Sequence, residues 1–493
     1  MCSRLTAGAA LALLIALHVG SLAALMARPP FLDEVESLQA GVRVARGERI
    51  YIDFAEHHPP FLFATLARLG PGDGAKSIRN YVIRARIVFA IFGTMAIAAA
   101  AAIVWRAAKS VWALVIFIAL LFNDPSLWLR AFADVHAEPV ALALWWGGLA
   151  LMLLASSSIA RGVGLGLVAH ASMWNPKWPV ASLVVGIAFL LSERKRRVAI
   201  IAAIAVTAAG IGLMAMFADL RVMWGNVFGL TRAMVQWSDR LQAMHLSVTG
   251  PAPVPWAWCP TVFLPRFVIP ATLVVLVALL RLPNRLISVL VALIAATLIE
   301  IRFLYPYPTP WVQYYILYAM VASSMFALVP QAIATLFLRA KATAIAIPVA
   351  ILAMIPAINI IPLKSAGDSY WQSFAYLHRN LQPADRIWID LARHPIGAYD
   401  AHYYWFGFDS LVPVALQYAP MSEHDLPPCR LERGLEPNLK FLSADYRRLP
   451  IVAGCFERLR VAGVVAPSPV PGVYVVNAKR SPISSRRPSK PDG

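Results

Sequence analysis

Long apolar runs with almost no charge recur along this chain, and they constrain its fold more than any other feature. The first covers residues 5–27, and another of the same character covers residues 83–105. A helix needs about 20 consecutive apolar residues to cross a bilayer. Composition agrees, because 59% of the 493 residues are hydrophobic and only 14% are charged, whereas soluble domains average roughly 45–50% and 25%. The sequence therefore predicts a polytopic α-helical membrane protein.

The apolar runs predict about eleven transmembrane helices, each near the length that a bilayer requires. They lie near residues 5–27, 83–105, 109–123, 137–155, 160–175, 177–192, 198–217, 263–281, 285–303, 312–337 and 342–363. The third and fifth are short and could be partly re-entrant, which leaves the count open by one or two. The first could instead be a cleaved signal peptide, since "ALMA" resembles a cleavage site. Its length and the many spans after it favour an uncleaved helix.

The net charge of +18 comes mostly from short basic clusters between the apolar runs. These clusters include "SERKRR" at residues 192–197, "RLPNR" at 281–285 and "LRAK" at 338–341. Basic connecting loops mark the cytoplasmic side of a membrane protein, so we do not expect nucleic acid as a partner. With the N-terminus in the cytoplasm, the basic connections lie inside, and the acids, prolines and long loops lie outside. An odd number of spans then places the C-terminal region outside as well.

A membrane domain over residues 1–363 is therefore expected to precede a small α/β domain over residues 364–477. "SYWQSFAYLHRNLQ" has the period of an amphipathic helix, and "DRIWIDL", "RVAGVVAPSP" and "GVYVVN" resemble strands. The Ser-, Pro- and Arg-rich residues 478–493 are expected to form a disordered basic tail. Cys429 and Cys455 would form a disulfide in an oxidising compartment. Two free thiols are the alternative.

The loop between the first two runs, residues 28–82, gathers an unusual number of acids. Asp33 and Glu34 follow the first run directly. Apolar or small residues then recur near helical spacing, at Val35, Leu38, Val42 and Ala45. This spacing predicts a helix along the membrane surface, with the two acids at its N-terminal end, where the helix dipole favours carboxylates. A simple helix cap with a solvated face is the alternative.

A second polar group closes the same loop. In "EHHPPF", Glu56, His57 and His58 precede two prolines that stiffen the chain. Histidines beside an acid can bind a divalent metal ion, but adjacent loop residues rarely both bind one ion. A metal therefore stays an alternative and is not assigned. Glu36 and Asp53, in the same loop, are expected to be ordinary surface acids.

Two further groups of ionisable residues stand near the ends of apolar runs. Arg130 and Asp134 lie four residues apart, before the run that starts near residue 137. Ionisable residues at membrane depth are costly and usually functional. Lys177, in "NPKWP", lies between two runs. A lone lysine there usually extends its ammonium group to water, but it could pair with a phosphate.

Taken in order, these motifs resemble the GT-C type glycosyltransferases that use polyprenyl-phosphate sugars. The most similar branch contains dolichyl-phosphate-mannose protein mannosyltransferases and bacterial aminoarabinose lipid A transferases. The matching positions are Asp33 and Glu34 after the first span, Glu56 before the double proline, Arg130 with Asp134, Lys177, and Tyr314 with Tyr315 in "PYPTPWVQYYILY". One departure is His58, which replaces the usual lysine beside the prolines and puts that phosphate contact in doubt.

The resemblance implies transfer of a sugar from a polyprenyl-phosphate donor to an acceptor hydroxyl, with inversion, at the outer face of the bacterial inner membrane. Asp33 would be the base, and Glu34 and Asp134 would orient it or bind sugar. The remaining matches would bind the donor: Glu56, His57, His58, Arg130, Lys177, Tyr314 and Tyr315. The acceptor, a glycan, lipid or protein of the cell envelope, stays open, and so does the sugar. The alternatives are a membrane transporter and a non-catalytic envelope-assembly protein.

Overall fold

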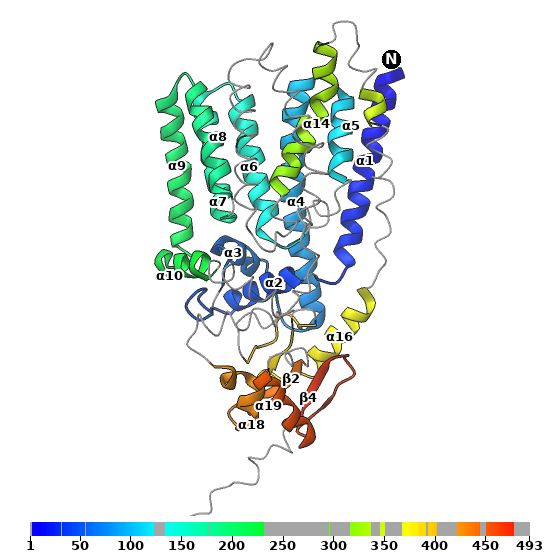
Figure 1. Cartoon of the computed structure of the whole chain (residues 1–493), viewed down its shortest axis with the longest axis vertical. Helices are drawn as coiled ribbons and strands as arrows, with labels where there is room; N and C mark the ends of the chain where they lie inside the picture. The colour runs from blue at the N-terminus through cyan, green and yellow to red at the C-terminus, as the bar shows by residue number, and fades with distance from the viewer. Residues whose placement is uncertain are drawn as a thin grey trace, which may run out of the picture. The chain divides into compact units, whose positions relative to one another are not determined.

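The chain is mostly helical and carries one small sheet (Figure 1). The structure, a computed structural model, describes residues 2–30, 32–54, 56–122, 134–176, 178–230, 295, 316–336, 346–350, 367–390, 393–401, 422–443 and 450–477. It divides into two compact units. The first comprises Met1–Ala27, Ala85–Phe217 and Pro251–Lys364, and the second comprises Arg28–Arg84, Ala218–Gly250 and Ser365–Gly493.

The apolar runs form helices at eight of the predicted spans, which confirms these segments as helical. They are α1 (Cys2–Ala27), α4 (Ala75–Ala108), α5 (Val111–Phe122), α6 (Ala137–Leu154), α7 (Ser158–Trp174), α8 (Pro179–Ser192), α9 (Arg196–Ala215) and α14 (Ile316–Leu336). The spans predicted at 263–281 and 285–303 lie outside the described residues, apart from the helical Ala295. Of the span at 342–363, residues 346–350 are described, and they are helical.

Three of the described helices are long and apolar enough to cross a membrane: α4, α6 and α9. Shorter apolar helical segments are Leu5–Gly20, Val111–Leu121, Pro179–Ser192 and Ala319–Gln331. One face of α4 exposes Ile87, Ile91 and Met95, by 46%, 55% and 54%. An exposed apolar stripe at this spacing suits a hydrocarbon environment better than water. These helices indicate association with a membrane.

Glycines on α7 allow its neighbours to approach closely. A Cβ atom added to Gly164 would lie 2.5 Å from the carbonyl oxygen of Gly148 on α6. A Cβ atom on Gly162 would lie 2.4 Å from the carbonyl oxygen of Ala199 on α9. A Cβ atom on Gly166 would lie 2.6 Å from the Cβ atom of Val206 on α9. Small residues spaced so that helix backbones can touch are typical of helix packing in membranes.

The C-terminal part of the second unit is an α/β fold. Its sheet has the order β1-β2-β4-β3, where β1 (Arg386–Trp388) and β2 (Leu439–Ser443) are parallel and the other pairs are antiparallel. The other strands are β3 (Val465–Pro467) and β4 (Val473–Val476), and the helices are α16 (Gly367–Arg379), α18 (Pro427–Glu432) and α19 (Pro450–Val461), with a 3-10 turn, η5 (Glu423–Asp425). Leu377, Ile387 and Phe441 lie in its core. The predicted amphipathic helix and three predicted strands are confirmed, whereas β2 was not predicted.

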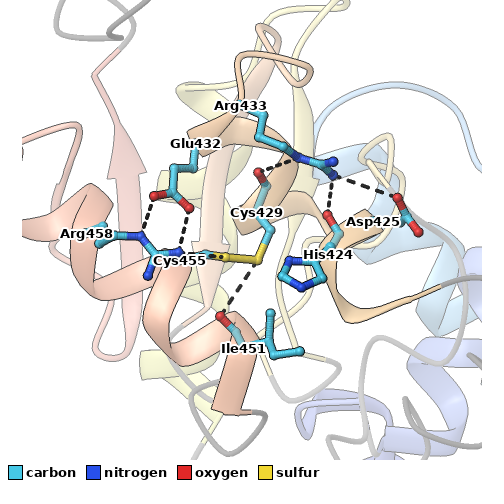
Figure 2. The surroundings of a disulfide bond; sticks show 8 residues. All are labelled: His424, Asp425, Cys429, Glu432, Arg433, Ile451, Cys455 and Arg458. Atoms are coloured by element: carbon cyan, nitrogen blue, oxygen red, sulfur yellow. Dashed lines mark hydrogen bonds and ion pairs between the residues drawn. A yellow bond between two sulfur atoms is a disulfide. The ribbon is translucent and has the colours of Figure 1, made fainter.

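Cys429 and Cys455 are joined by a disulfide (Figure 2). The predicted bond is therefore confirmed, and the alternative of two free thiols is wrong. Cys429 lies on α18 and Cys455 on α19, with Cα atoms 5.0 Å apart. Beside the bond, the guanidinium of Arg458 donates to both carboxylate oxygens of Glu432 (Figure 2). The bond and the ion pair therefore both link α18 to α19.

The first loop belongs to the same compact unit as the C-terminal fold. Its helices are α2 (Leu32–Ala45) and α3 (Pro60–Arg68), and the unit also holds α10 (Leu220–Trp224) and the π-helix η2 (Gly225–Leu230). The buried amide of Gln39 on α2 donates to the carbonyl of Ala398 and to the carboxylate of Asp400, each at 2.8 Å. Its oxygen accepts from the backbone N–H of Gly397 at 2.7 Å. Segments more than 350 residues apart are thus joined through one side chain.

Candidate functional site: the acidic first loop

The helix predicted at the start of the first loop is present as α2, and Asp33 and Glu34 stand in its first turn. The amides of a first turn lack partners within the helix, and the helix dipole favours negative charge there. Glu34 is fully buried, and its carboxylate lies 3.7 Å from the guanidinium of Arg28. Asp33 is half-buried. Asp33 is therefore the more accessible of the two acids.

α2 is buried around its whole circumference from residue 34 to residue 42. A Cβ atom on Gly41 would lie 2.5 Å from the Cβ of Leu66 on α3 and 2.7 Å from the Tyr81 hydroxyl on α4. Glycine is needed here because any side chain would force these elements apart. The alternative interpretation of α2 as a helix with one solvated face is wrong. α3 packs against it at Leu66, and residues 397–400 contact it through Gln39.

Glu56 lies at the centre of the second polar group. Its side chain is fully buried, and one carboxylate oxygen accepts from the backbone N–H groups of His57 at 2.8 Å and His58 at 3.3 Å. The Nδ1 atoms of His57 and His58 lie 3.2 Å and 3.0 Å from the same oxygen. Burial raises the pKa of Glu56, but hydrogen bonds and positive charge from both histidines outweigh it and hold that pKa well below its usual range. Glu56 is thus an anion that orders the turn.

Glu36 joins this group from α2, contrary to the expectation of a surface acid. It is only 7% exposed, and its Oε1 lies 3.5 Å from Nδ1 of His57. Burial raises the pKa of Glu36, and the negative charges of Glu56 and Asp33 raise it further. Sequence reasoning missed Glu36 because a single apolar stripe leaves the opposite face of a helix to solvent, and here that face is covered.

Asp53 is also expected to be a surface acid, and the structure confirms this. Its side chain is 34% exposed and forms an ion pair with Arg49 at 2.9 Å. The hydrogen bonds from Arg49 lower the pKa of Asp53 to about 2. Asp53 therefore serves as a surface acid of the same loop that stands apart from the buried group.

Asp134, the predicted site acid that precedes α6, belongs to the first unit. It is one of three buried ionisable residues in this segment. Asp134 is 5% exposed, His136 is 8% and Glu138 is 2%. The imidazole of His136 contacts the carboxylate of Glu138, and the amide of Asn175 donates to Glu138 at 3.3 Å. Asn175 caps the C-terminal end of α7, next to α6. Buried ionisable groups beside apolar helices are costly and point to a role beyond packing.

The remaining predicted site residues, Arg130, Lys177, Tyr314 and Tyr315, lie outside the residues that the structure describes. Among the described ones, Asp33, Glu34, Glu56, His57 and His58 share the second compact unit, and Asp134 belongs to the first. No protein-family model matches the chain, and no curated protein matches it either.

Proposed function

We propose that this protein is an integral membrane glycosyltransferase of about eleven spans that moves a sugar from a polyprenyl-phosphate donor to an acceptor hydroxyl. The reaction takes place at the outer face of the bacterial inner membrane and modifies a glycan, lipid or protein of the cell envelope. The observation that carries the proposal is the position of Asp33 and Glu34. They stand in the first turn of α2, directly after the apolar helix α1.

Asp33 is the base in this proposal. Its carboxylate takes the proton of the acceptor hydroxyl while the acceptor oxygen attacks the anomeric carbon of the sugar. The bond between that carbon and the phosphate oxygen breaks, and polyprenyl phosphate leaves with the electron pair. One displacement of this kind inverts the anomeric carbon.

The neighbouring acids suit this role less well than Asp33. Glu34 is fully buried near Arg28, which favours a role in positioning. Glu56 is held as an anion by His57 and His58, and a carboxylate with a depressed pKa is a weak base. Asp33 is the half-buried acid of the three, so an acceptor can approach it.

Positive charge stabilises the departing phosphate. In this proposal the imidazoles of His57 and His58, with side chains 21% and 14% exposed, contact the phosphate from the first loop. Arg130 and Lys177 supply the positive charge in this proposal, and Tyr314 and Tyr315 contact the donor. Asp134 binds or orients the sugar.

The test compares Asp33→Asn with the matched variant Asp53→Asn, using purified protein, a polyprenyl-phosphate sugar and an envelope acceptor. We expect Asp33→Asn to slow transfer by about 10²–10⁴-fold, the usual contribution of general base catalysis. Asp53→Asn should transfer at the wild-type rate, because Asp53 stands apart on the surface beside Arg49. Undiminished transfer by Asp33→Asn would overturn the assignment of the base.

A further inference from the structure

Four side chains of the first loop converge on one point. Glu36, Glu56, His57 and His58 each offer a ligand atom, and these atoms all lie within 4.8 Å of one another. We propose that they bind a single divalent transition-metal ion, with zinc as the best match. The proposal does not rest on sugar transfer, because it concerns the binding of an ion to residues other than Asp33.

The spacing of the ligand atoms fits one small ion. Ligand atoms bound at about 2.0–2.2 Å in a tetrahedron lie roughly 3.3–3.6 Å from one another. The Nδ1 atom of His57 lies 3.5 Å from Glu36 Oε1 and 3.2 Å from Glu56 Oε1, and that of His58 lies 3.0 Å from Glu56 Oε1. Only small shifts would bring these atoms into one coordination sphere.

Two buried carboxylate oxygens of this group would accept a cation. Oε2 of Glu56 and Oε1 of Glu36 are buried, and neither has a hydrogen-bond partner among the described residues. Glu56 is fully buried and Glu36 is 7% exposed. A buried carboxylate oxygen without a hydrogen bond costs free energy, and two neighbouring carboxylates also repel each other. A divalent ion between the two carboxylates would offset this cost.

The turn that carries the histidines is shaped so that neighbouring residues can bind together. The two imidazole rings lie with centroids 3.8 Å apart, and both Nδ1 atoms face the same oxygen of Glu56. The hydroxyl of Tyr51 donates to the carbonyl of His58 at 2.5 Å. α3 begins at Pro60, which fixes the chain after the turn. These contacts remove the objection that adjacent loop residues rarely bind one ion.

Ligand chemistry selects the class of ion. Calcium and magnesium prefer all-oxygen sites, whereas two imidazoles with two carboxylates suit zinc and related transition metals. The partly exposed edges of His57 and His58 provide a path for the ion to enter. A bound ion, rather than protonated imidazoles, would then supply the positive charge of this turn, and it would tie the turn to α2.

The test is zinc binding by the full-length protein, purified in detergent and stripped with a chelator, in the absence of donor and acceptor. We expect one Zn²⁺ per chain by titration calorimetry and elemental analysis. Glu36→Gln and His58→Gln should weaken binding by more than about 100-fold, since loss of an outer-shell partner alone costs about 10–100-fold. Asp53→Asn, in the same loop, should bind as the wild type does.

A conservative variant separates binding from folding. His58→Cys replaces imidazole with a thiolate, another zinc ligand, and should restore the binding that His58→Gln loses. The Co²⁺ complex of the wild type should show the visible absorption of a tetrahedral site. Stripped wild-type protein that binds no added Zn²⁺, or a Glu36→Gln variant that binds Zn²⁺ as tightly as the wild type, would overturn the proposal. Neither result depends on whether the protein transfers sugar.

Discussion

At the scale of single residues, the disulfide between Cys429 and Cys455 joins two short helices. α18 has 6 residues and α19 has 12, and the bond spans a sequence separation of 26. Closing a loop of this length restricts the unfolded chain and contributes about 3–4 kcal/mol to stability in the chain-entropy model.

Removing this bond should therefore destabilise the C-terminal fold measurably. We expect reductant to lower the unfolding midpoint of the purified protein and to raise the number of titratable thiols by two. The double variant Cys429→Ser with Cys455→Ser should start at the lower midpoint and should not respond to reductant. A wild-type midpoint that reductant leaves unchanged would contradict the stabilising role.

The acids of the first loop show how far residue-level prediction reaches. The sequence correctly predicts that Asp33 and Glu34 stand in the first turn of a helix, because start signals of a helix are local. It does not distinguish Glu36 from Asp53. Glu36 is buried by contacts with His57 and Glu56, twenty or more positions along the chain, and periodicity carries no information on such contacts.

At the scale of elements, the close approach of α6 and α7 depends on glycine. Gly164→Ala would place a Cβ atom 2.5 Å from the carbonyl oxygen of Gly148. We expect the two helices to separate at a cost of about 1–3 kcal/mol, which lowers the unfolding midpoint in detergent. The control is Gly147→Ala, where an added Cβ meets nothing within 4 Å. Equal midpoints for the two variants would show that the contact does not matter.

Helices and strands are predicted correctly where a local sequence pattern determines them. Apolar runs give eight of the predicted helices, and short β-rich segments give β1, β3 and β4. β2, "LKFLS", escapes prediction because it is short and includes a lysine; its place between β1 and β4 depends on pairing. The hydrogen bond from Gln39 to Ala398 could not be predicted either, because it joins residues that are far apart in the sequence.

At the scale of the whole molecule, the distribution of charge predicts one orientation in the membrane, with the basic connecting loops in the cytoplasm. The disulfide of the second unit agrees with an oxidising compartment outside the cytoplasm. Val461, at the end of α19, is 76% exposed, and Arg194, between α8 and α9, is exposed as well. These two positions should face opposite sides of the membrane.

Cysteine labelling tests this orientation. In a chain with Cys2→Ser and Cys259→Ser, we expect Val461→Cys to react with a membrane-impermeant maleimide in intact spheroplasts. Arg194→Cys should react only after lysis, because the positive-inside rule predicts that its basic loop faces the cytoplasm. The reverse pattern would place the first loop inside the cell and remove the proposed site from the outer face.

Our central proposal is that this membrane protein transfers sugar from a lipid phosphate. The most direct test reconstitutes wild-type protein in liposomes with a panel of labelled polyprenyl-phosphate sugars and an extract of envelope acceptors. We expect labelled acceptor and an equal amount of released polyprenyl phosphate, and we expect Asp33→Asn to lose both. Absence of transfer from every donor, together with solute flux through the same liposomes, would contradict it and identify a transporter.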